Sequence, residues 1–404
     1  MLMFKIAFRN IFRQKRRTIF TALTIFGGFV LAAFSIGWAD GSYTFIINMF
    51  TRNRLGHIQI HYKDYLNQPS IYKTISNYEE VAEKLDDMDH IESWTPRLFA
   101  AGLLSLHDQS TGAQLTGIQP EKENQATRFR QKIIKGELFE KADHKTVLGK
   151  GLARVLQANV GDSVVFISQA ADGSMANDIY EVCGILESGD SMSDRMAFYL
   201  HLQDAQDLMV LYGQIHEIAV IVDELGRVDM MTDRLRDAFT NEDLTVEPWQ
   251  EFAKSFYHAM KADMEGMWIM LIVIMLIVAV GVLNTVLMSV LERTREYGLL
   301  KAMGTKPVQI FKLVLYQVNI LTFFSCLLGI ALSIILNYWL SKDGITLPNA
   351  FTYGGMEFKH MYTTVNLRSI LLPLITVFFT AVIVGIFPAI RAAKNDPAQS
   401  MRTH

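Results

Sequence analysis

The chain is organised around residues 266–304, which read GMWIMLIVIMLIVAVGVLNTVLMSVLERTREYGLLKAMG. No charged residue occurs in this stretch before Glu292, and about 20 apolar helical residues cross a bilayer core of roughly 30 Å. The charged part that follows ends at Gly304, with Pro307 close behind, which is typical of a helix end. The stretch therefore predicts a membrane helix followed by a short amphipathic helix. We call residues 292–304 the foot segment.

Three further uncharged runs predict membrane helices of similar length. They cover residues 18–39, 313–341 and 369–390, and with 265–291 they make four predicted spans. Half of all residues are hydrophobic and the formal net charge is only −3, so bulk charge gives no reason to expect a nucleic-acid partner. The composition predicts an α-helical membrane protein.

Residues 40–264 have a different composition, with charged residues every few positions. Alternating segments such as 57–61, 163–168 and 218–222 predict strands, and helical patterns lie between them. This segment is long enough to bury a core of its own. We expect a large α+β domain between the first two spans, divided into two subdomains and ending in a stalk helix.

The predicted stalk leads into the second span. Its apolar residues recur at three- and four-residue steps, as in an amphipathic helix. They are Trp249, Phe252, Phe256, Met260 and Met264. The alternative is a core helix of the α+β domain that merely meets the membrane.

Residues 1–17 carry six Lys or Arg and no acidic residue. Apolar side chains recur there at helical spacing, which predicts an amphipathic helix in the interface of an anionic leaflet. A cleaved signal peptide is the alternative. The apolar run that follows is longer than the 7–15 residues typical of a signal peptide, which favours a retained first span.

The distribution of positive charge predicts the orientation of the spans. Six Lys or Arg lie in the leader, five in the loop 292–312 and three in the tail 391–404, against three in the polar loop 342–368. The positive-inside rule then places both termini and the foot segment in the cytoplasm and the large domain outside.

The sequence offers no catalytic, cofactor or metal site that we can identify. His57 and His61 share one face of a predicted strand with Gln59, and we expect that face to be solvated. No Gly-x-x-x-x-Gly-Lys-Ser/Thr loop occurs, so ATP and Mg²⁺ are expected on a separate ATPase subunit. Cys183 and Cys326 lie in regions of opposite character, which argues against a disulfide.

The foot segment resembles the coupling segment of the FtsX-like, MacB-type family of ABC transporter permeases. The residues that carry this resemblance are Glu292, Arg293, Arg295, Glu296, Gly298, Leu299, Leu300, Lys301, Ala302 and Gly304. The ending Pro388 to Arg402 is similar to the family's C-terminal pattern, with Met401 where Leu is usual. Turns at Gly117–Glu121 and Val147–Ala153 resemble the family's MacB-like periplasmic domain.

The resemblance implies a dimer of permease chains, identical or homologous, in the bacterial inner membrane with two copies of a cytoplasmic ABC ATPase. It implies mechanotransmission, in which ATPase closure moves the outer domains through the coupling segment and stalks. The residues that would contact the ATPase are Glu292, Arg293, Arg295, Glu296, Leu299, Leu300, Lys301, Met303 and Gly304.

The layout without a fused ATPase is closest to the lipoprotein-releasing, LolC/LolE-like branch, and the segment Gly56–His61 also resembles that branch. This favours extraction of lipoproteins or other amphiphiles from the membrane lipid. Two alternatives remain: efflux of drugs or peptides through a periplasmic adaptor, and regulation of a cell-wall hydrolase without transport.

Overall fold

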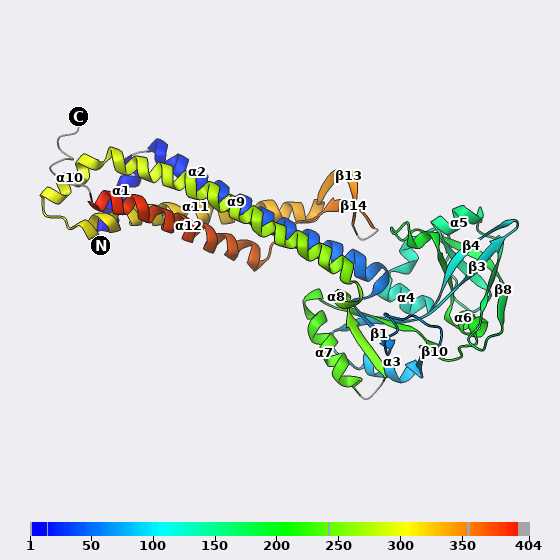
Figure 1. Cartoon of the computed structure of the whole chain (residues 1–404). Coiled ribbons are helices and arrows are strands. Elements are labelled where there is room, and N and C mark those ends of the chain that lie inside the picture. The colour runs from blue at the N-terminus through cyan, green and yellow to red at the C-terminus, as the bar shows by residue number, and fades with distance from the viewer. Residues whose placement is uncertain (1, 14, 241–242, 354–355, 395–404) are drawn as a thin grey trace. The chain divides into compact units, whose positions relative to one another are not determined.

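The computed structural model describes residues 2–13, 15–240, 243–353 and 356–394. The chain divides into two compact units, whose elements are labelled in Figure 1. The helical unit comprises Met1–Tyr43, Met260–Leu347 and His360–His404. The α+β unit comprises Thr44–Ala259 and Pro348–Lys359.

Long apolar helices make up the helical unit. Its helices are α1 (Leu2–Arg13), α2 (Lys15–Phe50), α9 (Lys254–Glu292), α10 (Thr294–Ala302), α11 (Pro307–Asp343) and α12 (Leu367–Lys394). Within the described residues, four of them (α2, α9, α11 and α12) are long and apolar enough to cross a membrane. Each predicted span thus falls within one of these helices, and α1 and α10 lie at the same end of the unit (Figure 1).

The first long helix extends well beyond the predicted boundary at residue 40. It continues to Phe50 and is followed by a π-helix, Thr51–Leu55. Asp40 suggested a boundary because a carboxylate is costly in a membrane span, but this one is paired. Its carboxylate lies 3.1 Å from the Arg368 guanidinium and accepts a 2.8 Å hydrogen bond from the Asn366 amide.

Small residues allow α2 and α9 to approach closely. A Cβ atom added to Gly28 would lie 2.1 Å from Cγ2 of Val278, and one added to Gly281 would lie 2.4 Å from Cγ2 of Thr24. By contrast, a Cβ at Gly27 would meet nothing within 4 Å. Of the two adjacent glycines, therefore, Gly28 makes the close helix contact.

The segment predicted as a polar loop between the last two spans contains a β-hairpin. Its strands are β13 (Ile345–Tyr353) and β14 (Met356–Met361). The prediction missed the alternation of apolar and polar residues in both halves, which is the usual signal for paired strands.

A ten-stranded sheet forms the framework of the α+β unit, with the order β12-β1-β11-β3-β4-β9-β6-β8-β5 and with β7 paired to both β3 and β8. Its strands are β1 (Ile58–Tyr62), β3 (Ile91–Leu106), β4 (Gln109–Ile118), β5 (Ile133–Gly136), β6 (Lys145–Gly149), β7 (Ser163–Gln169), β8 (Met175–Leu186), β9 (Ala197–His201), β11 (Glu217–Val222) and β12 (Leu244–Pro248). The short strands β2 (Ile75–Ser76) and β10 (Gln214–Ile215) pair separately. The helices are α3 (Tyr78–Asp86), α4 (Pro120–Thr127), α5 (Lys150–Leu156), α6 (Leu202–Met209), α7 (Val228–Ala238) and α8 (Trp249–Phe252).

The long strand β3 belongs to two parts of this sheet. Its residues 91–97 pair with β11, and residues 103–105 pair with β7. The pairings β3-β4-β9-β6-β8-β7 and back to β3 close a ring of six strands. The unit is therefore a closed barrel joined through one strand to an open sheet that contains β1, β11 and β12 (Figure 1).

Candidate functional site

The foot segment folds into a short helix of its own between α9 and α11. Arg293, with φ −96° and ψ 11°, interrupts the helical path after α9. Gly304 has φ +94°, a left-handed conformation that glycine adopts without strain. The N–H of Thr305 donates to the Leu300 carbonyl at 3.0 Å, and Pro307 opens α11. The helix therefore ends where the sequence predicts.

The inner face of α10 packs into the helical unit. Tyr297 is 2% exposed, and Leu300 packs against the same apolar cluster. The buried members of this cluster come from α1, α9, α10, α11 and α12: Ala7, Val290, Tyr297, Ile310, Leu313, Val314, Ile320, Ala389 and Ala392. Burial raises the pKa of Tyr297, with the neighbouring Arg293 opposing the shift, so the phenol stays neutral. The foot is thus anchored in the core of the helical unit.

Most of the charged side chains that were predicted to contact the ATPase form bonds within the helical unit. Arg293 is 3% exposed, and its Nη2 donates to the Asn10 carbonyl of α1 at 3.3 Å. Lys301 Nζ donates to the Ala393 carbonyl of α12 at 2.5 Å. Two ion pairs tie the foot to the N-terminal helices: Glu296–Arg13 at 3.0 Å and Glu292–Arg17. These side chains hold the foot in place.

The outer face of α10 presents Arg295, Leu299, Ala302 and Met303, all exposed. Leu299 and Met303 are 56% and 67% exposed. Steps of three and four residues place these side chains on one helical face. Exposed leucine and methionine beside a guanidinium make a small apolar patch with one positive charge. We call these four residues the foot patch.

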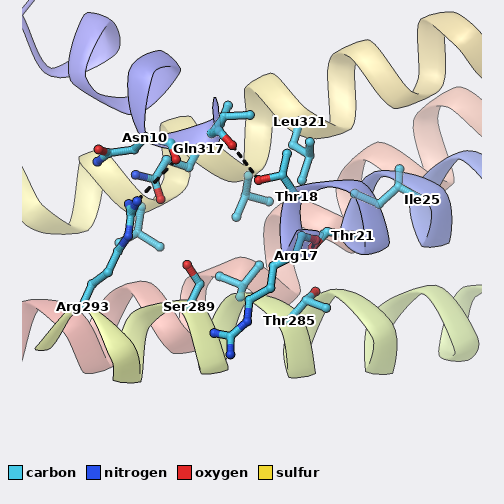
Figure 2. A pocket seen from close by; sticks show the side chains of 14 residues that line it. Asn10, Arg17, Thr18, Thr21, Ile25, Thr285, Ser289, Arg293, Gln317 and Leu321 are labelled. Atoms are coloured by element: carbon cyan, nitrogen blue, oxygen red, sulfur yellow. Dashed lines mark hydrogen bonds between the residues drawn. The ribbon is translucent and has the colours of Figure 1, made fainter. Parts of the chain in front are cut away.

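A polar cavity of about 60 Å³ lies beside the foot, among α1, α2, α9 and α11. Figure 2 shows the Arg293 side chain reaching toward Asn10 and Gln317, with Ser289 beside it and Arg17 extending from α2. Arg17 Nη1, Arg293 Nε and Gln317 Nε2 are buried without a hydrogen-bond partner in the described part of the chain. The sequence pattern did not indicate a cavity here.

Two family matches divide the chain. Residues 18–238 match the family described as MacB-like periplasmic core domain, and residues 268–397 match the FtsX-like permease C-terminal family. The chain belongs to the FtsX-like, MacB-type ABC transporter permeases. The FtsX-like match contains the whole foot segment. The family predicted from the sequence is confirmed.

Relatives of this permease include proteins named for lipoprotein release and for macrolide export. The lipoprotein-releasing system transmembrane protein LolC of Neisseria meningitidis is 21% identical over 82% of this chain and 83% of its own length. The macrolide export ATP-binding/permease protein MacB of Campylobacter jejuni is 23% identical over 98% of this chain and 61% of its own length. The crystal structure of the periplasmic region of MacB from Actinobacillus actinomycetemcomitans covers 49% of this chain and 91% of that chain, with 16% identity and a TM-score of 0.37.

The permease's predicted stalk is broken at Ala253. Trp249 and Phe252 lie in the separate short helix α8, whereas Phe256, Met260 and Met264 lie in α9. The backbone of Ala253, with φ −109° and ψ 45°, leaves the helical region and separates the two helices. The periodicity of the apolar residues continues across the break, which is why the sequence predicted one helix.

In the α+β unit, the ends of two long helices meet through aromatic rings. Phe50 near the end of α2 stacks on Phe256 in the first turns of α9, with ring centroids 3.8 Å apart. Beside them lies a hollow of about 810 Å³. Its apolar lining includes Phe50, Leu55, Leu66, Phe252 and Phe256. This hollow is large enough for an acyl chain or an apolar side chain.

Charged contacts anchor the π-helix that follows α2. Arg54 contacts Ser193 and lies 3.3 Å from the Asp190 carboxylate, and Lys132 Nζ donates to the Asn53 carbonyl. Burial lowers the pKa of Lys132 to about 8. The end of α2 is therefore held within the barrel part of this unit by several directed bonds.

A buried ion cluster lies next to that anchor. The Arg97 guanidinium bonds Glu123 at 2.7 Å and Glu217 at 2.9 Å, and all three side chains are about 5% exposed. Burial raises the pKa of Glu217 to about 7, with Arg97 opposing the shift. The sequence did not indicate this cluster, although Glu217 is the one charge in the otherwise apolar strand β11.

The prediction of a solvated face for His57 and His61 is wrong. Both are 1% exposed, and the His61 ring stacks on Tyr65 with ring centroids 5.2 Å apart. His57 Nδ1 accepts from the Val222 N–H at 3.0 Å, and His61 Nε2 lies 3.2 Å from Gln59 Oε1. Burial lowers the pKa of each imidazole to about 4, so both are neutral. Within the described residues, no group of three or more His, Cys, Asp or Glu side chains could hold a metal.

Of the ending Pro388 to Arg402, residues 395–402 lie outside the described residues. Cys183 and Cys326 are both free thiols.

Proposed function

We propose that this permease couples ATP hydrolysis by a separate ABC ATPase to work done by its α+β unit. The observation that carries this proposal is the foot patch. Leu299 and Met303 are exposed on a helix whose opposite face, with Tyr297, is fixed in the core. An exposed apolar patch on a rigid support is suited to docking a protein partner. The chain itself is not the ATPase, and ATP and Mg²⁺ bind to the partner.

Mechanotransmission fits the connections of this foot. Residue Glu292 ends α9, which is one uninterrupted helix from Lys254, and the foot begins directly after it. At its other end α9 carries Phe256, which stacks on Phe50 of α2. A force applied at α10 is thereby passed along α9 to residues of the α+β unit. This transfer needs no pore through the bilayer.

For the substrate, we infer extraction of lipoproteins or other amphiphiles from the inner membrane. The hollow of about 810 Å³ at Phe50 and Phe256, lined by apolar residues together with Glu217 and Lys254, supports an amphiphile, because an acyl chain leaving the bilayer needs an apolar surface and a headgroup needs polar partners. The LolC relative, which spans 82% of this chain, bears a lipoprotein-releasing name. The second candidate is efflux with a periplasmic adaptor, favoured by the MacB relative that matches 98% of the chain.

The proposed complex is a dimer of permease chains with two ATPase subunits. Both termini and the foot lie in the cytoplasm, and the α+β unit lies in the periplasm. A cysteine introduced at the exposed Ser174 should then react with an impermeant maleimide in intact cells whose outer membrane is permeabilised. A cysteine at Thr305 should react only after lysis. The reverse pattern would contradict the orientation.

Affinity purification tests the function as a whole. The tagged chain, taken from its native membrane in mild detergent, should retain an ABC ATPase together with lipoproteins or lipids identified by mass spectrometry. An adaptor beside the ATPase would favour efflux, and a cell-wall hydrolase would favour a regulator that does not transport. Recovery of the chain without any ATPase would contradict the coupling.

A further inference from the structure

The polar cavity beside the foot has hydrogen-bond donors that nothing in the described chain uses. Arg293 is 3% exposed, and its Nε is 3.9 Å from the nearest Glu296 oxygen, too far for a hydrogen bond. Arg17 Nη1 and Gln317 Nε2 are buried and unpaired as well. Arg17 lies in α2, Gln317 in α11, and Arg293 between α9 and α10. Buried polar groups are normally paired, so three unpaired donors around one cavity call for an acceptor.

The missing acceptor is an anion. The fourteen residues that line the cavity include two arginines and no acidic residue. The nearest carboxylates, Glu292 and Glu296, bind other atoms: Glu292 pairs with Arg17 Nη2, and Glu296 pairs with Arg13. These pairs leave Arg17 Nη1 and Arg293 Nε without a partner, and guanidinium groups bind oxyanions most strongly.

Three donors from three separate parts of the chain match a group with several oxygens better than a carboxylate, which has two. A water molecule needs about 10–15 Å³ of such space, so a cavity of about 60 Å³ has room for about four oxygen-sized atoms. We propose that this cavity binds a phosphate group. Arg17, Arg293 and Gln317 would donate to its oxygens.

The surroundings favour a phospholipid headgroup as the source of that phosphate. Along α2, Ile19 and Phe20 lie between the cavity residues Thr18 and Thr21 and are 55% and 65% exposed. These apolar side chains would lie along the acyl chains of a lipid whose phosphate entered the cavity. The six basic residues of the leader add attraction for an anionic lipid. This inference goes beyond the proposed function and does not depend on an ATPase.

The test is native mass spectrometry of the purified, delipidated full chain, mixed with equal amounts of phosphatidylglycerol and phosphatidylcholine. We expect one phosphatidylglycerol bound per chain, in preference to phosphatidylcholine. Arg17→Gln and Arg293→Gln should each lower this binding about tenfold or more, as the loss of a charge-assisted bond requires. Arg16→Gln is the matched control, because Arg16 is exposed and does not line the cavity. Its binding should fall less than that of either cavity variant, because it loses only one leader charge.

Gln317→Leu should weaken lipid binding without impairing folding. It removes an unpaired amide and keeps the side chain's shape, so the delipidated variant should unfold at no lower temperature than the wild type while binding less phosphatidylglycerol. Inorganic phosphate is the second arm. If it raises the unfolding temperature of the lipid-free chain, and Arg293→Gln and Gln317→Leu abolish that effect, the cavity binds a phosphate group that comes from solution. Equal lipid binding by wild type, Arg293→Gln and Gln317→Leu, with no effect of phosphate, would overturn the proposal.

Discussion

Replacing Leu299 with aspartate tests the foot patch at its centre. The leucine side chain is 56% exposed, so more than half of its surface is available to be buried by a partner. Complete burial of a leucine contributes about 1.5–3 kcal/mol, and the exposed share therefore contributes about 1–1.5 kcal/mol. Aspartate loses this contribution and also places a carboxylate against an apolar contact, which costs about 2 kcal/mol or more.

The sum of about 3 kcal/mol corresponds to a loss of about 100-fold in affinity. We would measure the dissociation constant between the detergent-purified chain and its co-purifying ATPase, together with ATPase stimulation in proteoliposomes. Leu299→Met is the matched control, since it keeps an apolar side chain of similar volume at the same position. It should bind within a few-fold of wild type.

An unchanged dissociation constant for Leu299→Asp would refute the assignment of the foot patch. Equal loss in Leu299→Met would also refute the reasoning, because apolar burial would then not be the cause. Leu300→Asp is a poorer test. Leu300 packs against the buried cluster beneath α10, so aspartate there would disrupt the support of the foot as well as any docking.

Three further predictions concern stability, each measured by unfolding of the purified chain in detergent. Gly28→Leu should destabilise the helical unit by about 1–3 kcal/mol because its Cβ would meet Val278 of α9, while Gly27→Leu, which faces open space, should have little effect. Arg97→Met should cost about 3–5 kcal/mol, because it leaves two buried carboxylates without their cation; an unchanged unfolding temperature would contradict this. The pKa of His61 is lowered to about 4 in the folded state, so stability should fall as pH decreases from about 6.5 toward 4, where only the unfolded chain gains the proton. His61→Gln should weaken this dependence, and a pH profile identical to wild type would contradict the assignment.

The membrane spans could be predicted because an uncharged run of sufficient length has few alternatives. Their ends could not. The prediction ended the first span before Asp40 and missed the continuation to Phe50, because the partners of Asp40 are Arg368 and Asn366, more than 300 residues away. The break at Ala253 was also hidden, since one non-helical residue does not disturb the apolar periodicity on either side of it.

The foot segment was identified as a whole, but its two faces were not. The sequence places Arg293, Arg295 and Lys301 together as coupling charges. In the structure only Arg295 belongs to the exposed patch, whereas Arg293 and Lys301 bond backbone carbonyls of α1 and α12. Which face is inner depends on helices from both ends of the chain, and the local pattern carries no information about them.

The strands of the α+β unit follow from alternation, but their environment does not. Alternation placed His57 and His61 on one face of a strand and left that face solvated. That face is covered by residues that come later in the chain: Tyr65 stacks on His61, and β11, which begins at Glu217, pairs with β1. The same long-range pairing brings Arg97 and Glu217 together at the buried ion cluster.

The most direct test of the central claim is photo-crosslinking in living cells. A photoreactive amino acid in place of Met303, which is 67% exposed on the foot patch, should capture an ABC ATPase, identified by mass spectrometry of the crosslinked band. The same amino acid at Ser174, exposed in the α+β unit, should not capture it. Capture of the ATPase from Ser174 and not from Met303 would contradict the account, since the foot would then not be the surface that the ATPase drives.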